Sequence, residues 1–212
     1  SDDRLEVGAD GRVIRHGTLR TPQGTLTSKY VYHMIPSDPL VGKMVEYPVK
    51  EVEDWDIQQA YFEEMNERAV EPALDQVCEA YRVMGDKGVA SVAIGSVYTR
   101  LGSARGMQAL LIDLYDIPDR LAAVAEAAAA YREKIIAAFL ISPAEIAVHD
   151  FCWATGSNMS PGMFERWVLP EVRRAVELIH AKPGKYVGLY TLGRIREVLP
   201  MLVEAGVDFI ET

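Results

Sequence analysis

Hydrophobic residues are spaced in two different ways along the chain, and the change falls near residue 50. Before that point apolar and polar residues alternate, which is typical of half-exposed strands. Two strands are predicted, Arg12 to His16 and Thr25 to His33, joined through the turn-forming residues Thr21-Pro22-Gln23-Gly24. Residues 1–50 therefore predict an antiparallel β-ribbon, followed by a loop from Pro36 to Pro48 that contains three prolines and a glycine.

From Asp54 onward, short apolar runs alternate with longer stretches of helical spacing. The predicted strands are Val89 to Ile94, Glu145 to Val148, Lys185 to Tyr190 and Val207 to Ile210. The predicted helices run over Asp56 to Met84, with a break at Pro72, over Asp119 to Leu140, onward from Ser160-Pro161, and over Ile195 to Ala205. This alternation indicates βαβ units, so residues 51–212 predict an α/β domain with four parallel strands in sequential order. The spacing alone leaves open a barrel and a doubly wound sheet.

Two helices carry an apolar stripe that marks the expected core. The stripes consist of Leu121, Val124, Ala128, Ile135 and Phe139, and of Phe164, Val168, Val172, Val176 and Ile179. The last predicted strand is followed directly by Thr212, with no helix to cover it, so we expect the sequence to be a fragment of a longer protein.

The composition narrows the classes of partner and site. The net charge of -9 disfavours nucleic acid and anionic membranes as partners. Two isolated cysteines, Cys78 and Cys152, predict neither a disulfide framework nor a zinc site, which favours a cytoplasmic protein. No leader or membrane-spanning run is found, so a soluble protein is expected. No dinucleotide-binding motif or P-loop is found either, so no nucleotide cofactor is expected.

Candidate site residues are chosen by one rule: β/α barrels place their working residues just after the carboxyl ends of the strands. Asp150 is the strongest catalytic candidate and Tyr190 the second, while His149 must point to the opposite face from Asp150. The expected substrate contacts are Ser96, Tyr98, Arg100, Trp153, Ser157, Asn158, Arg194 and Glu211. Asp150, Ser96 and Tyr190 are expected to line one cleft, and Arg100 and Arg105 are expected in a loop with two glycines. Structural alternatives stay open: Asp150 as a loop acceptor, Trp153 packed under its loop, and the arginines as solvated surface groups.

An ordered series of short motifs between Val89 and Thr212 resembles the uroporphyrinogen decarboxylase family. The series comprises Gly95-Ser96-Val97-Tyr98-Thr99, His149-Asp150, Ser160-Pro161, Phe164, Leu169-Pro170, Gly193, Leu199-Pro200 and Ala205-Gly206-Val207-Asp208. The resemblance implies that the parallel strands are part of a TIM (β/α)8 barrel, with the ribbon as an insertion.

Two branches of this superfamily imply different chemistry. The decarboxylases remove carboxyl groups from a tetrapyrrole without a cofactor, whereas the corrinoid methyltransferases hold zinc through a His-x-Cys-Gly segment. Aligned on Gly193, that His and Cys fall on Tyr190 and Leu192, so no zinc is expected there. The decarboxylases' catalytic Tyr falls on Ser103, and their early arginines and aspartate would lie before Ser1.

The resemblance therefore favours a cofactor-independent decarboxylase-like enzyme, a carboxy-lyase that acts on a tetrapyrrole-type or other carboxylated small molecule. Two alternatives stay open: a corrinoid-dependent methyltransferase or demethylase component without the zinc motif, and a degenerate, non-catalytic barrel fragment. The expected partner is a small molecule, with a second copy of the chain, forming a homodimer, as a further option.

Overall fold

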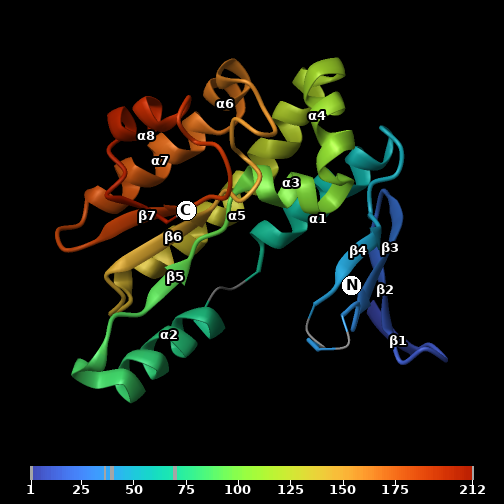
Figure 1. Ribbon diagram of the computed structural model, residues 1–212, viewed down its shortest axis with the longest axis horizontal. Helices are drawn as coiled ribbons and strands as arrows, with labels where there is room; N and C mark the ends of the chain where they lie inside the picture. Colours follow the sequence, from blue (N-terminus) through green and yellow to red (C-terminus); the bar gives the residue numbers. More distant parts are fainter. Residues whose placement is uncertain (1, 36, 39–40, 69–70, 212) are drawn as a thin grey trace. The chain divides into compact units, whose positions relative to one another are not determined.

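The computed structural model describes residues 2–35, 37–38, 41–68 and 71–211 (Figure 1). Its chain divides into two compact units, the first formed by residues 1–65 with 101–127 and the second by residues 66–100 with 128–212. Each unit contains one four-stranded sheet. The structure is thus an α/β fold with an antiparallel sheet at the start of the chain, as the sequence predicts, and the barrel stays a prediction.

The sheet of the first unit is antiparallel, and its strands follow the chain in the order β1-β2-β3-β4. The strands are β1 (Asp2–Val7), β2 (Val13–Thr21), β3 (Gly24–Tyr32) and β4 (Lys43–Glu46). Thr21 pairs with Gly24 across the predicted turn, which leaves Pro22 and Gln23 as its two central residues. The predicted ribbon is confirmed, but β1 is an addition to it, and β4 lies in the stretch predicted as a loop. Residues 36, 39 and 40 of that stretch lie outside the described residues.

Helices of the first unit meet at a buried carboxylate. They are α1 (Asp54–Asn66) and α4 (Met107–Asp116), with the end of α3 (Val97–Arg105) and the start of α5 (Pro118–Ile141). Asp113 of α4 accepts hydrogen bonds from the Trp55 indole N–H at 2.8 Å and from Arg105 Nε at 2.8 Å. The prediction that Arg105 lies in a loop is therefore wrong, because this buried ion pair holds it at the end of a helix.

The second unit confirms the predicted parallel sheet, whose strands run in the order β5-β6-β7-β8. The strands are β5 (Ser91–Ala93), β6 (Ile146–Asp150), β7 (Tyr186–Tyr190) and β8 (Phe209–Glu211). The other elements are α2 (Glu71–Met84), the 3₁₀ turn η1 (Gly85–Lys87), α6 (Pro161–Trp167), α7 (Leu169–His180) and α8 (Leu199–Ala205). The predicted break at Pro72 is present, since α1 ends at Asn66 and a new helix starts at Glu71.

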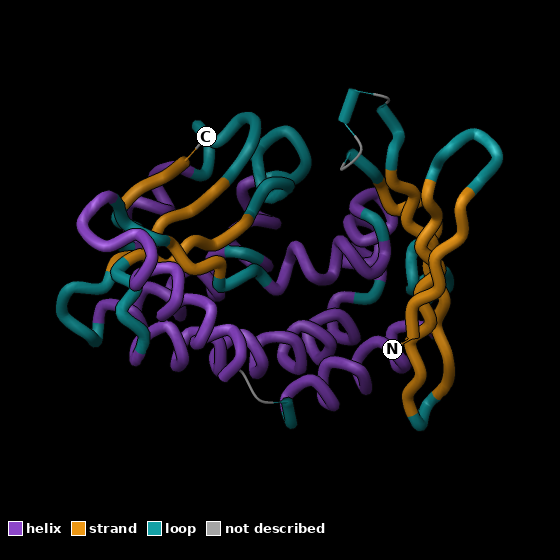
Figure 2. Tube along the Cα trace, turned by 90° about the horizontal axis from the view of Figure 1, so that it is seen from below, coloured by secondary structure: helices purple, strands orange, loops and turns teal. Residues whose placement is uncertain are grey.

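Helices gather along one face of the parallel sheet (Figure 2). On that face Ala147, His149 and Leu189 are buried, whereas Val148 and Asp150, which alternate with them along β6, are only half-buried. The predicted stripe from Phe164 to Ile179 is buried throughout. Within α5, Ile136 takes the fully buried position predicted for Ile135. Among the described residues, no helix has the length and apolar character that a membrane crossing requires.

Replacement of Asp113 by Asn is expected to destabilise the first unit, because it leaves the largely buried Arg105 guanidinium without a counter-charge. The free energy of unfolding should fall by about 3 kcal/mol. Asp116→Asn is the matched control, since Asp116 is exposed on the same helix, and it should change stability by about 0.5 kcal/mol or less. Urea unfolding of both variants makes the measurement, and an equal loss in the two would contradict the role given to Asp113.

Candidate active site

Three candidate residues form a row across the carboxyl ends of the parallel strands. Asp150 pairs with Tyr190 in the β6–β7 ladder, and Tyr190 pairs with Glu211 in the β7–β8 ladder. Because directly paired residues of neighbouring strands share a face, the three side chains lie side by side on the less buried face of the sheet. The structure thus brings together three of the predicted site residues, and we call them the rim row.

The acidic neighbours change the chemistry of Tyr190. Burial raises the pKa of its hydroxyl, and the nearby Cys152, Glu211 and Asp150, which would repel a phenolate, raise it further. At neutral pH the hydroxyl therefore stays protonated and can donate a hydrogen bond. The rim row offers two carboxylates and one hydroxyl donor, a set suited to a ligand with N–H groups or developing positive charge.

Asp150 also organises the loop that follows its strand. Its Oδ1 accepts the backbone N–H of Cys152 at 3.0 Å, so the alternative role as a loop acceptor is present as well. Burial, together with the hydrogen bond to Asp150 and the charge of that carboxylate, raises the pKa of the Cys152 thiol to about 12. A thiol with this pKa is protonated at neutral pH, so Cys152 is a poor nucleophile.

The loops after β6 and β7 are joined by hydrogen bonds between Gly156, Ser157 and Arg194. The Gly156 N–H donates to the Arg194 carbonyl at 2.7 Å, and the Arg194 N–H donates to Ser157 Oγ at 3.2 Å. The Arg194 guanidinium donates to the Gly156 carbonyl at 2.8 Å. Gly193 permits this approach, because its φ of +107° suits glycine and a Cβ there would lie 3.2 Å from Ser157 Oγ. Ser157 and Arg194 therefore hold the two loops together.

The same loops expose two apolar side chains near the rim row. Trp153 is 40% exposed and Leu192 is 48% exposed, so the Trp153 ring is not packed wholly under its loop. The Trp153 carbonyl accepts a hydrogen bond from the Asn158 side-chain amide at 2.9 Å, which orders the turn between them. An exposed indole in the loop that follows Asp150 is compatible with a flat ligand.

The candidate residues that come first along the chain, Ser96, Tyr98 and Arg100, lie in or next to the core. Ser96 is 1% exposed, and its Oγ accepts the backbone N–H of Thr99 at 2.9 Å as the cap of α3. Tyr98 is 2% exposed, and burial raises the pKa of its hydroxyl. Arg100, predicted in a loop, is helical and lies 5.3 Å above the Tyr131 ring. Because their side chains are buried, Ser96 and Tyr98 do not share an open cleft with Asp150, contrary to the expectation for Ser96.

Beneath the rim row lies a buried polar network that the sequence analysis missed. The Glu171 carboxylate accepts the first backbone N–H groups of α3, from Val97 at 2.8 Å and Tyr98 at 3.2 Å. Arg132 lies 3.3 Å from the same carboxylate and donates to His149 Nε2 at 3.1 Å. Arg132 and Glu171 each occupy a buried helical position, and a charged residue within an apolar stripe was the available signal.

His149 is neutral in this network. Its Nε2 accepts from Arg132, which can only donate, so the ring proton lies on Nδ1. Burial lowers the pKa of His149 well below the usual 6.5, and the Arg132 charge lowers it further. The imidazole therefore has a structural role on the helix-covered face, as the alternation along β6 predicts.

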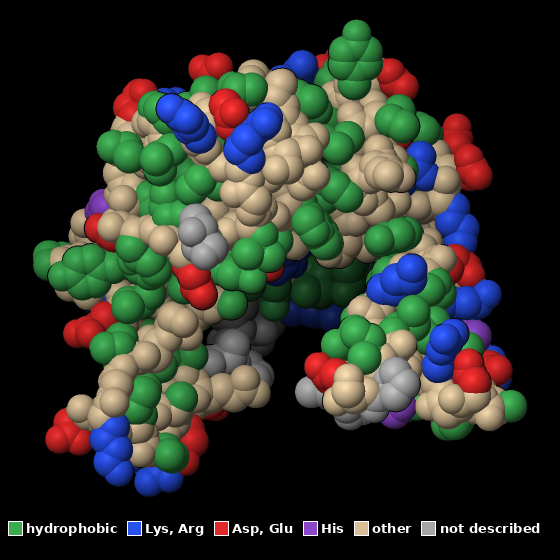
Figure 3. Space-filling model, viewed as in Figure 1, with side chains coloured by type: hydrophobic (Ala, Val, Ile, Leu, Met, Phe, Trp, Pro, Cys, Tyr) green, Lys and Arg blue, Asp and Glu red, His purple; other side chains and the backbone are tan. Residues whose placement is uncertain are grey.

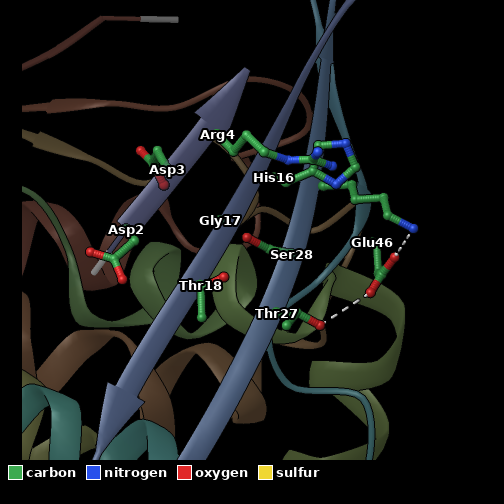
Figure 4. A pocket seen from close by; sticks show the side chains of 10 residues that line it. Asp2, Asp3, Arg4, His16, Gly17, Thr18, Thr27, Ser28 and Glu46 are labelled. Atoms are coloured by element: carbon green, nitrogen blue, oxygen red, sulfur yellow. Dashed lines mark hydrogen bonds and ion pairs between the residues drawn. The ribbon is translucent and has the colours of Figure 1, made fainter. Parts of the chain in front are cut away.

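Two hollows among the described residues lie away from the candidate residues. A cavity of about 470 Å³ lies on the antiparallel sheet, where Figure 4 shows charged side chains of β1 beside His16 of β2 and hydroxyl side chains of β2 and β3. A cavity of about 10 Å³ between Phe151, Leu189 and Leu202 is too small for an organic ligand. Within the described ranges, no three His, Cys, Asp or Glu side chains are grouped closely enough to hold a metal ion.

The buried His149 predicts a loss of stability in mild acid. Below pH 6.5 the unfolded chain takes up a proton that the folded chain excludes, so the unfolded state binds more protons and stability falls as the pH falls. The contribution approaches about 1.4 kcal/mol per pH unit. Urea unfolding between pH 7 and pH 5 should show this slope in the wild type and lose it in His149→Gln. The exposed His33→Asn control should keep it, and a slope unchanged in His149→Gln would contradict the assignment.

Comparisons with known proteins agree with the fold. The chain resembles the solved structure of a methyltransferase from Methanosarcina mazei with a TM-score of 0.61 and 13% sequence identity. The alignment covers 80% of this chain and 48% of that one, so the chain spans about half the length of that methyltransferase. At this identity the likeness concerns the fold alone. A search of curated proteins found no match.

The family assignment rests on sequence. The model of the family described as uroporphyrinogen decarboxylase matches residues 39–212, which is most of the chain and includes every residue of the rim row. The motif series from Gly95 to Asp208 lies within this match. The chain therefore belongs to the uroporphyrinogen decarboxylase family.

Proposed function

We propose that this chain provides part of the β/α barrel of an enzyme that decarboxylates a tetrapyrrole-type or similarly carboxylated small molecule without a cofactor. The observation that carries the proposal is the rim row, in which Asp150, Tyr190 and Glu211 lie in direct register at the strand ends. Family membership and the position of active sites in β/α barrels support the same assignment.

The rim row suits the charge that such a reaction develops. When the C–C bond to the carboxyl group breaks, CO₂ leaves and the electron pair must pass into the adjacent ring, after which a proton takes the place of CO₂. A ring that has first gained a proton carries a positive charge and accepts this pair. Once a proton has taken the place of CO₂, the ring releases the proton that it gained. The carboxylates of Asp150 and Glu211 would stabilise that charge, and the protonated Tyr190 hydroxyl would donate to a substrate oxygen.

The candidates on the loops after β6 and β7 would orient the substrate around this row. Trp153 would stack on a flat ring, while Ser157, Asn158 and Arg194 lie on the two joined loops beside it. The buried Ser96 and Tyr98 would not touch the substrate; the Thr99 hydroxyl beside them donates to the Asp150 carbonyl at 2.9 Å. That bond fixes the start of α3 against the end of β6.

Methyl transfer by a corrinoid-dependent enzyme or demethylase component is the second candidate. Its support is the fold shared with the Methanosarcina mazei methyltransferase. Tyr190 and Leu192 stand where the zinc-binding His and Cys would be expected, and the protonated Cys152 thiol offers no substitute nucleophile. Decarboxylation agrees better with these residues.

Replacement of Asp150 by Asn tests the proposal. The amide oxygen can still accept the Cys152 N–H, so the melting temperature should stay nearly unchanged while the negative charge is lost. Turnover of a porphyrinogen, followed by counting the carboxyl groups of the products by mass spectrometry, should fall about 100-fold or more. Asp86→Asn, an exposed change in η1 before β5, is the control and should leave turnover intact.

The competing outcomes are distinct. Unfolding of Asp150→Asn would make Asp150 a structural acceptor only. A spectral change with methylcobalamin and a thiol acceptor, without decarboxylation, would replace the proposal by methyl transfer. Equal turnover in wild type and Asp150→Asn would show that the rim row takes no part in the reaction.

A further inference from the structure

The first strand of the antiparallel sheet has an open edge. Within the described part of the chain, β1 has a single neighbour, β2, and all six of its residues are exposed. Leu5 is 65% exposed and Val7 is 72% exposed, both on one face of the strand. An edge strand with unpaired backbone groups and exposed apolar side chains is a template for another strand.

We propose that two copies of the chain form a homodimer through antiparallel pairing of β1 with β1, about a two-fold axis at Leu5. The two four-stranded sheets would then join into one sheet of eight strands. The opposite edge suits this role less well, because β4 has only four residues and its pairing with β3 shifts register at Lys29 and Tyr30.

Symmetry restricts the register to a few choices. In an antiparallel pair of identical strands the two-fold axis is perpendicular to the sheet, so the same face of each strand stays on the same side. Odd-numbered residues of one copy therefore pair with odd-numbered residues of the other, and even-numbered with even-numbered. The axis must therefore lie midway between a residue and the same residue of the other copy. For β1, with the sequence Asp-Asp-Arg-Leu-Glu-Val, the central positions are Asp3, Arg4, Leu5 and Glu6.

Charge selects one of these four registers. An axis at Asp3, Arg4 or Glu6 places that charged residue opposite its own copy, which is unfavourable. An axis at Leu5 places Leu5 against Leu5, and it sets Arg4 of each copy opposite Glu6 of the other. This register alone forms two opposite-charge pairs without a like-charge pair.

The two charged side chains of the proposed pairs lie on the same face of β1. Arg4 and Glu6 lie on one face of β1, with 3.4 Å between Arg4 Nη2 and Glu6 Oε2. The same Glu6 oxygen lies 3.0 Å from the His16 ring, and Figure 4 shows Arg4 and His16 on neighbouring strands. Figure 3 shows basic and acidic side chains side by side on this part of the surface. A second copy therefore meets charges of both signs in a short, defined order.

Cysteine cross-linking tests the register in the full chain carrying Cys78→Ser. With the axis at Leu5, the two thiols introduced by Leu5→Cys face each other at about 5 Å between Cα atoms, within reach of a disulfide. This variant should thus give a covalent dimer on mild oxidation, with the link between the two substituted positions identified by peptide mapping. Val7→Cys is the matched control: its copies lie four residues apart along the strand, about 13 Å, and should not cross-link.

A charge exchange tests the same contact without oxidation. Arg4→Glu should raise the dimer dissociation constant about tenfold or more, measured by sedimentation equilibrium, because it sets the new carboxylate opposite Glu6 twice. The double variant Arg4→Glu with Glu6→Arg should restore the wild-type constant. A monomeric wild type, a dimer of Leu5→Cys that does not cross-link, or a dimer insensitive to Arg4→Glu would each overturn the proposal.

Discussion

A nearly buried carboxylate fixes the geometry beneath the candidate site. Glu171 accepts two backbone N–H groups from the first turn of α3 and faces the Arg132 guanidinium, while both side chains are almost fully buried. Burial raises the pKa of Glu171 and lowers that of Arg132, which shows how strongly desolvation opposes this pair. Such a pair persists because removal of either partner would leave an uncompensated charge in the core. The pair fixes the positions of three helices, because a shift of α3, α5 or α7 would break a hydrogen bond or ion pair of Glu171.

The network also determines how β6 presents its last residues. His149 is held on the helix-covered face by the hydrogen bond from Arg132, and the alternation of a strand then turns Asp150 to the other face. A slip of one residue in β6 would exchange the two, burying a carboxylate against a guanidinium already paired with Glu171. The identity of the residue at the rim therefore depends on a histidine that takes no part in the proposed reaction.

Local patterns were sufficient for much of this fold and insufficient for the rest. The parallel strands, the break at Pro72 and the Ser160 cap follow from apolar spacing and from the backbone chemistry of proline and serine. The stretch containing Arg100 and Arg105 was expected to be a loop because of its glycines, but contacts with residues distant in sequence keep it helical. β1 and β4 carry many charges and exist through pairing with neighbouring strands.

The candidate site divides in the same way. Asp150, Tyr190 and Glu211 could be found because the end of a strand is visible in the sequence, and their register follows from parallel pairing. The burial of Ser96 and the contacts among Glu171, Arg132 and His149 depend on which helix packs on which strand. The spacing of residues within one segment does not predict this packing.

The loops after β6 and β7 share three hydrogen bonds through Gly156, Ser157 and Arg194, so neither can leave its position alone. They form one cooperative unit, and their amide protons should exchange with solvent in a single opening event. Entry of a ligand past Trp153 and release of a product past Leu192 would then be governed by the same opening equilibrium. The frequency of that one motion, set by three hydrogen bonds, would bound the rate at which the enzyme could work.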